Sequence, residues 1–141
     1  MLEGSIVDGT HRLELRVHYE DTDFSGFVYH ANYLKFCERG RSDFLRVLGL
    51  DQKAMMAGDG LMFVVRRMVC DFLKPARFDE ELTIETVPVE QAGARFEMRQ
   101  KVLRGAEALF TAEVTAVLID RRGRPRRLPP EMARLLSGTP S

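Results

Sequence analysis

The order in which two hydrophobic periods follow one another is the strongest constraint on how this chain can fold. Residues 11–19 alternate apolar and polar side chains, a period of two that is typical of a half-buried strand. Residues 20–29 break the alternation. Apolar side chains then recur at spacings of three and four from Tyr33 to Leu48, which predicts an amphipathic helix that ends near Gly49. Strand-like patterns without intervening helical periods follow at residues 61–73, 80–89, 95–103 and 107–119.

One strand, one long helix and four successive strands predict an α+β fold with an antiparallel sheet, because βαβ repeats would alternate strands with helices. Residues 91–94, Gln-Ala-Gly-Ala, are typical of a hairpin turn. A short helix that begins with proline is expected around residues 129–136. Gly40 costs the long helix about 1 kcal/mol relative to alanine. We therefore expect a close neighbour, such as a wrapped sheet, against its backbone, with a tolerated imperfection as the alternative.

Length and composition indicate a single globular domain, residues 1–141. The chain is 45% hydrophobic, which is too apolar for intrinsic disorder, and it has no internal repeat or linker. Lys plus Arg and Asp plus Glu number 21 each, so no overall charge favours nucleic acid or an anionic membrane. One basic run, broken by Gly123 and Pro125, is interpreted as a solvated turn: Arg121, Arg122, Arg124, Arg126 and Arg127.

Two further features bear on location. No stretch approaches about 18 apolar residues and the N-terminus lacks a basic, then apolar, pattern, so neither a membrane span nor a signal peptide is expected. Cys37 and Cys70 are too few for a disulfide framework or a zinc site, and both sit among apolar residues. We therefore expect a reducing, cytoplasmic location.

The strand patterns also predict an oligomer. Alternation divides the apolar side chains of residues 61–73 into two faces, Val64, Met68, Cys70 and Phe72 against Phe63, Val65 and Val69. Residues 107–119 are likewise apolar on both faces. One helix covers only one face of a sheet, so a second subunit is expected to cover the rest. A homodimer or homotetramer follows from this.

The densest cluster of functional side chains, residues 20–33, joins the first strand to the long helix. A helix N-terminus offers unpaired backbone N–H groups and a partial positive charge, which suit a carbonyl oxygen that becomes an oxyanion. A carboxylate on the preceding loop could attack that carbonyl or activate water against it. The segment therefore favours acyl-transfer chemistry.

Motifs from about residue 13 to residue 129 carry a resemblance to a known family. They are Tyr19-Glu20-Asp21-Thr22-Asp23, Gly26, Val28-Tyr29-His30-Ala31, Tyr33, Glu38-Arg39, Phe63-Val64-Val65-Arg66, Pro75-Ala76-Arg77 and Gly123-Arg124-Pro125. In this order they resemble the hotdog-fold 4-hydroxybenzoyl-CoA thioesterase family, and most closely its YbgC-like, Tol-Pal-associated branch of acyl-CoA thioesterases. The resemblance implies a five-stranded antiparallel sheet wrapped around one long helix.

The resemblance also implies an activity, the hydrolysis of a short- to medium-chain acyl-CoA or of an acyl carrier protein thioester. It places the catalytic aspartate on Asp23, as general base or nucleophile. The helix start that polarises the carbonyl falls on His30, through its backbone N–H alone or also through its side chain. Substrate-binding positions fall on Gly26, Val28, Tyr29 and Arg66. No cofactor is implied, since coenzyme A is part of the substrate.

Simpler interpretations stand beside these. Asp23 could be a turn residue that binds local N–H groups, and Asp21 is expected to brace the loop. Tyr33 is expected to pack rather than to line the acyl pocket. A metal site built from His18, Asp21, Asp23 and His30 lacks the usual ligand spacing. A triad that uses Ser25 lacks the nucleophile-elbow motif.

The phosphates of coenzyme A need basic partners. The candidates by position are Arg66, Arg67, Lys74 and Arg77. In the turn of residues 91–95, Arg95 is the one charged side chain. The aromatic-acyl-CoA member of the family has a run of basic residues in this turn, so hydroxybenzoyl-CoA is not favoured as substrate. Two alternative functions remain: a hotdog dehydratase acting on 3-hydroxyacyl thioesters, and a protein that binds acyl carrier protein or envelope machinery with little turnover.

Overall fold

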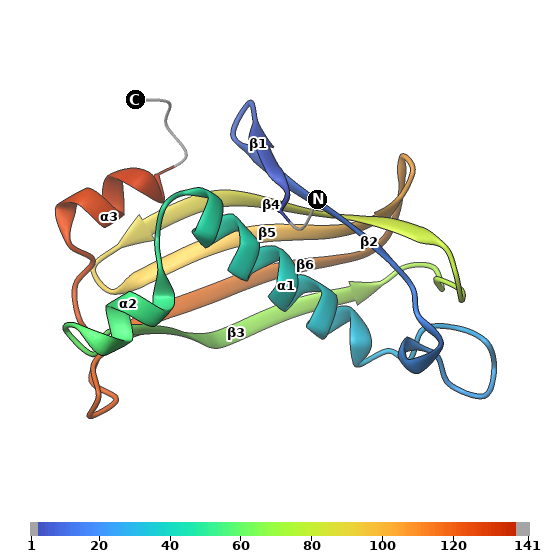
Figure 1. Cartoon of the computed structure of the whole chain (residues 1–141), viewed down its shortest axis with the longest axis horizontal. Helices are drawn as coiled ribbons and strands as arrows, with labels where there is room; N and C mark the ends of the chain where they lie inside the picture. The colour runs from blue at the N-terminus through green and yellow to red at the C-terminus, as the bar shows by residue number, and fades with distance from the viewer. Residues whose placement is uncertain (1–2, 138–141) are drawn as a thin grey trace.

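An antiparallel sheet forms the frame of the molecule, which the computed structural model describes over residues 3–137. Within this part of the chain six strands pair in the order β1, β2, β4, β5, β6, β3 (Figure 1). Their bounds are β1 Ser5–Val7, β2 Thr10–Arg16, β3 Met62–Phe72, β4 Glu81–Ala92, β5 Arg95–Arg104 and β6 Glu107–Ile119. The two edges of the sheet are therefore β1 and β3.

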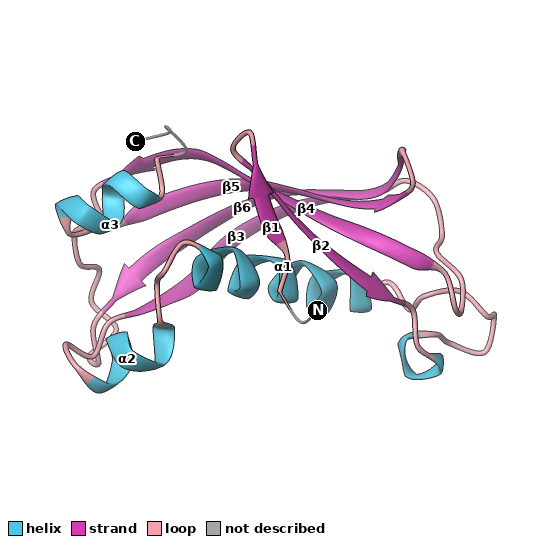
Figure 2. Cartoon of the chain, turned by 45° about the horizontal axis from the view of Figure 1, so that its top comes forward, coloured by secondary structure: helices cyan, strands magenta, loops and turns pink. Residues whose placement is uncertain are grey.

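The long helix α1, Asn32–Val47, lies across one face of this sheet (Figures 1 and 2). Its buried side chains include most of those that the period predicted, Tyr33, Phe36, Cys37 and Phe44. Asn32, Asp43 and Leu45 are also buried, and the predicted Leu48 is only half-buried. The sheet curves around α1, and the core fills the space between them. This arrangement is the hotdog fold that the resemblance implied.

Gly40 lies where α1 approaches the sheet most closely. A Cβ atom added there would stand 2.7 Å from Ile84 Cγ2 and 3.1 Å from Gln100 Nε2. Real Cβ atoms essentially never come within 3.0 Å of another heavy atom, so only glycine lets the helix pack at this depth. The expectation that a neighbour presses on the backbone at Gly40 is confirmed.

The strand count, the end of the first predicted strand and one additional helix differ from the sequence prediction. The sheet has six strands rather than five, because the three-residue β1 pairs with β2. The first predicted strand ends at Arg16, and Tyr19, assigned to its dry face, instead begins a short 3₁₀ helix, Tyr19–Asp21, and is 82% exposed. The unpredicted helix α2, Gln52–Ala57, begins with a cap in which Asp51 Oδ1 accepts from the Ala54 N–H.

The predicted turn and terminal helix are present. Ala92 pairs with Arg95, so the hairpin turn consists of Gly93 and Ala94, with Gly93 at a φ of 61°. The short helix α3, Pro130–Leu135, lies within the range expected for it. None of the described helices is long and apolar enough to cross a membrane.

A β-bulge changes which residues of β3 face the core. Directly paired residues of an antiparallel sheet point to the same side, and the β3–β6 register shifts between Val65 and Arg67. Before the shift, Val65 pairs with the buried Ala116, and after it Met68 pairs with the buried Val114. The core-facing row is therefore Phe63, Val65, Met68, Cys70 and Phe72. The assignment of Val64 to the same face as Met68 was wrong, because Arg66 is an extra residue at the bulge.

The bulge also moves the exposed apolar surface. The face of the sheet turned away from α1 carries charges of both signs, among them Arg67, Glu97, Arg99 and Glu113. The exposed apolar side chains of β3 include Val65 and Phe72, which belong to its core-facing row but lie at the open edge, where they are 45% and 52% exposed. Exposed apolar surface thus lies at the edge of the sheet, and the outer face adds Val69, 41% exposed, among its charges.

Candidate active site

A buried carboxylate ties the loop after β2 to the start of α1. Asp21 is 5% exposed. Its side chain accepts a hydrogen bond from the His18 N–H at 2.8 Å and another from Asn32 Nδ2 at 2.9 Å. Asn32 is the first residue of α1. The Asp21 carbonyl also accepts from the Tyr29 N–H at 2.9 Å. Asp21 therefore braces the loop, as expected, and fixes it against the helix.

Asp23 projects from the tight turn that this brace holds. The Gly26 N–H donates to the Asp23 carbonyl at 3.0 Å, and Gly26 has a φ of 86°, a conformation that favours glycine. The exposed Asp23 carboxylate accepts hydrogen bonds from the Ser25 hydroxyl and, at 2.9 Å, from the Ser25 N–H. These two bonds hold the pKa of Asp23 below its ordinary value, and the nearby His30 lowers it further. Asp23 is therefore ionised at neutral pH.

The start of α1, a few residues after this carboxylate, offers free backbone donors. The N-terminal cap of the helix is Ala31, so His30 immediately precedes it. Within residues 3–137 the N–H groups of His30 and Ala31 donate to no protein acceptor, whereas the next N–H, of Asn32, donates to the Tyr29 carbonyl at 2.8 Å. Two free N–H groups at the positive end of a 16-residue helix can polarise a carbonyl oxygen and bind the oxyanion that forms from it.

Aromatic rings surround the exposed His30 side chain. The Tyr29 ring centroid lies 4.6 Å from that of His30, and the Phe72 centroid lies 6.1 Å away in an edge-to-face arrangement. Phe72 is the last residue of β3. The end of the edge strand therefore forms one wall beside the helix start, a contact that sequence reasoning missed because 42 positions separate the two rings.

The other predicted site residues lie in different surroundings. Val28 is buried, and its N–H donates to the Ala76 carbonyl at 2.9 Å, so it supports the loop from beneath. Tyr33 packs, as expected: its ring stacks on Phe110 at 5.2 Å, and its hydroxyl accepts from the Ala76 N–H at 2.9 Å. Arg66 lies in the middle of β3 at the bulge, about 20 Å along the strand from the Phe72 end. The structure thus brings Asp23, Gly26, Tyr29 and His30 together, but not Val28 and Arg66.

Two of the four candidate phosphate ligands are engaged elsewhere. Lys74 Nζ lies 2.6 Å from Glu107 Oε2, and the guanidinium of Arg77 stands 5.1 Å over the Phe27 ring. Arg67 contributes to a hollow on the outer face of the sheet. Arg77 nevertheless lies at the Asp23 end, because its bridge partner Phe27 accepts the Asp23 N–H, so it stays a candidate phosphate ligand within the same chain.

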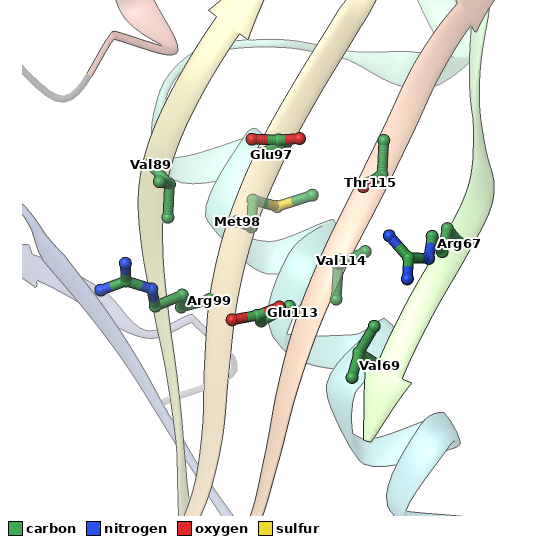
Figure 3. Close-up of a pocket in the computed structure, with 9 residues that line it drawn as sticks. All are labelled: Arg67, Val69, Val89, Glu97, Met98, Arg99, Glu113, Val114 and Thr115. Atoms are coloured by element: carbon green, nitrogen blue, oxygen red, sulfur yellow. The ribbon is translucent and has the colours of Figure 1, made fainter. Parts of the chain in front are cut away.

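Two of the cavities that border the sheet differ in their walls. One of about 290 Å³ lies between α1 and β3 and is lined by polar residues such as Glu38 and by apolar ones such as Leu45, Phe63 and Phe96. The other, of about 220 Å³, lies on the outer face, where Figure 3 shows Arg99 beside Glu113 with α1 behind the strands. Only the first has an apolar wall suited to an acyl chain.

Other reactive side chains do not form a second centre. Among the described residues, no group of three or more His, Cys, Asp and Glu side chains is arranged to hold a metal ion. Both cysteines are free. Burial raises the pKa of the Cys37 thiol to about 12, so this thiol stays protonated and is not a nucleophile at neutral pH.

Comparison with known proteins identifies the family. The model of the Thioesterase-like superfamily matches residues 17–136, which include the loop, α1 and most of the sheet. The chain belongs to this superfamily. The acyl-CoA thioester hydrolase YbgC of Escherichia coli O6:H1 is 40% identical over 120 residues, which cover 84% of this chain and 89% of that protein. This thioesterase is thus a thioester hydrolase of the YbgC-like branch, as the resemblance implied.

Solved structures agree with this assignment. A probable thioesterase from Bartonella henselae is 50% identical and superposes with a TM-score of 0.82, covering 85% of this chain and 99% of that one. A 4-hydroxybenzoyl CoA thioesterase mutant complexed with 4-hydroxybenzoyl CoA superposes with a TM-score of 0.84 at 21% identity, covering 92% of this chain and 99% of that one. The second likeness concerns the fold alone.

Proposed function

We propose that this thioesterase hydrolyses acyl-CoA to the free acid and coenzyme A, with Asp23 and the start of α1 as its catalytic site. Two observations carry the proposal: the ionised Asp23 carboxylate, which lies near enough to His30 for that residue to lower its pKa, and the N–H groups of His30 and Ala31, which have no protein acceptor within residues 3–137. The N–H groups bind the thioester oxygen as negative charge develops on it. The acyl-CoA thioester hydrolase YbgC, at 40% identity, supports the choice of substrate.

Asp23 acts either as general base for water or as nucleophile. Both roles require the carboxylate, and the hydrogen bonds from Ser25 keep it in that form. Incorporation of ¹⁸O into Asp23 during a single turnover in labelled water would establish the nucleophilic role. A nucleophile forms a mixed anhydride whose hydrolysis at the carboxylate carbon labels the enzyme, whereas attack by water labels only the released acid.

We further propose that the enzyme prefers substrates with short- and medium-chain acyl groups. In this proposal the His30 side chain, flanked by aromatic rings, lies next to the bound thioester. The exposed rings of Tyr29 and Phe72 offer apolar contact close to His30. The cavity between α1 and β3 offers further apolar surface. Acyl carrier protein thioesters remain alternative substrates, and an acyl-acyl carrier protein thioesterase of Arabidopsis thaliana is 28% identical over 131 residues.

The assembly that supports this activity is a homo-oligomer built on a dimer through β3. β3 is an eleven-residue edge strand whose side chains Val65 and Phe72 are half exposed. Its protection from pairing is confined to the bulge at Arg66 and the charges beside it, and the apolar side chains on either side of the bulge leave the rest of the edge open. A second copy that pairs antiparallel with this edge satisfies its backbone groups and covers these side chains.

The test is release of free thiol across acyl-CoAs and acyl carrier protein thioesters of increasing chain length. Hydrolysis with a maximum at short or medium chains is the expected result. Formation of an enoyl thioester without free thiol would indicate a dehydratase instead. If no thioester is hydrolysed, while the protein retains tight binding to acyl carrier protein, the enzymatic proposal fails and the binding function replaces it.

A further inference from the structure

The basic turn after β6 has no role in the site of its own chain. This turn follows Ile119, which pairs with Met62 at the start of β3. Its distance from the His30 end of the strand is about 33 Å, the length of the ten intervals between Met62 and Phe72. In Figure 1 the turn lies at the lower left, beside α2 and past the β3 edge, whereas α1 begins at the lower right.

The turn is held firmly while two of its arginines remain free. The Asp120 carboxylate accepts from the N–H groups of Arg122 and Arg124, at 2.9 and 3.0 Å. Arg121 Nη2 donates to the Met56 carbonyl at 2.9 Å, and Arg126 lies 3.4 Å from Asp120. The exposed side chains of Arg122 and Arg124 make no hydrogen bond or ion pair within residues 3–137.

A dimer through β3 brings this turn to the partner's site. In an antiparallel pair related by a two-fold axis, the start of one strand lies opposite the end of the other. The turn beside Met62 of one subunit therefore lies next to Phe72 of its partner, whose ring contacts His30. Within its own chain, each turn lies at the opposite end of β3 from the site.

We infer that Arg122 and Arg124 bind the phosphate groups of coenzyme A in the active site of the partner subunit. Guanidinium groups bind phosphate oxygens through paired, charge-assisted hydrogen bonds. The anchored backbone of the turn presents these two side chains at little conformational cost. This inference rests on the proposed function, and it adds two free guanidinium groups from the partner to the single exposed Arg77 that lies beside the Asp23 loop of the same chain.

The first test compares Arg122→Gln/Arg124→Gln with the matched variant Lys101→Gln/Arg134→Gln, which removes the same charge from other exposed positions. Substrates are an acyl-CoA and the corresponding acyl-pantetheine, which lacks the nucleotide phosphates. The turn variant should raise KM for acyl-CoA by at least about tenfold, leaving kcat and all acyl-pantetheine constants unchanged. The matched variant should behave as wild type.

The second test establishes which subunit supplies the arginines. A heterodimer is isolated, by two affinity tags, from one Asp23→Asn subunit and one Arg122→Gln/Arg124→Gln subunit. Its single live site then combines Asp23 of the second subunit with the arginines of the first. Binding across the dimer predicts the wild-type KM for acyl-CoA at half the kcat per dimer. A KM as high as that of the homodimeric arginine variant would overturn the inference.

Failure of the inference is separable from failure of the proposed function. Wild-type protein that hydrolyses acyl-pantetheine, together with an unchanged KM for acyl-CoA in the turn variant, leaves the enzyme activity intact and removes the phosphate site. A wild-type protein that hydrolyses neither thioester contradicts the proposed function itself. A monomer in solution that hydrolyses acyl-CoA with a KM unaffected by its concentration also overturns binding by the partner.

Discussion

At the scale of single residues, Asp21 illustrates how a buried carboxylate can position the proposed catalytic residue, Asp23. Asp21→Ala removes the acceptor for both the His18 N–H and the Asn32 amide. We expect a loss of about 1–3 kcal/mol in the free energy of unfolding. We also expect a fall in kcat larger than any change in KM, because the loop no longer holds Asp23 in a fixed position relative to the start of α1. Urea denaturation and steady-state kinetics measure the two effects. The exposed Asp71→Ala should change neither, and equal losses for both variants would contradict the role of Asp21.

Ser25 sets the pH range in which Asp23 works. The reactive form of Asp23 is the carboxylate, so activity is present above its pKa and is lost as the pH falls through that value. The Ser25 hydroxyl is the largest cause of the lowered pKa. Ser25→Ala should therefore move the acidic limb of the kcat/KM profile to higher pH and leave the activity at neutral pH nearly unchanged. An unshifted acidic limb would show that Asp23 does not control it.

The sequence predicted the local part of the site and missed the contacts made across the fold. Asp23, Gly26 and His30 lie within eight residues of one another, so turn chemistry and a helix start were enough to group them. The contact of Phe72 with His30 depends on where β3 ends beside α1, which no local pattern specifies. Val28 illustrates a different kind of error. It was predicted to bind substrate because it belongs to the motif, but its side chain is buried in the core.

At the scale of elements, the contact of α1 with the sheet depends on Gly40. Helix propensity alone predicts that Gly40→Ala stabilises the protein by about 1 kcal/mol. The added methyl would meet Ile84 Cγ2 at 2.7 Å, so we expect destabilisation of about 1–3 kcal/mol instead. Thermal or urea unfolding decides the sign. Ser42→Ala, at a half-buried position of the same helix, should lie within about 0.5 kcal/mol of wild type.

The elements were predictable where their periods were long and uninterrupted. The helix and the hairpin strands follow their patterns closely, whereas one inserted residue at Arg66 reversed the alternation of β3, so that Phe63 and Val65 were assigned to the wrong face. The buried pair of His11 and Asp43, with Nε2 and Oδ2 2.6 Å apart, joins β2 to α1 over 32 positions. Polar residues that meet only in the folded chain leave no periodic signal, so this pair was also missed.

At the scale of the whole molecule, the edge of the sheet should control assembly. Val65→Lys places a charge on the β3 edge, so we expect it to produce monomers with reduced activity. Val89→Lys is a matched control, because Val65 and Val89 are 45% and 44% exposed but Val89 lies on β4, away from the edge. Sedimentation or light scattering gives the masses. Monomers from Val89→Lys alone would place the interface on the outer face instead.

The central claim is that the Asp23 carboxylate performs the chemistry at the start of α1, and the rate of thiol release by Asp23→Asn tests it most directly. Loss of the carboxylate should lower kcat by about 10²–10⁴, while the exposed position of Asp23 leaves thermal unfolding unchanged. Asp59→Asn, at an exposed position elsewhere, should retain full activity. An Asp23→Asn protein that is folded and hydrolyses acyl-CoA at the wild-type rate would contradict the account.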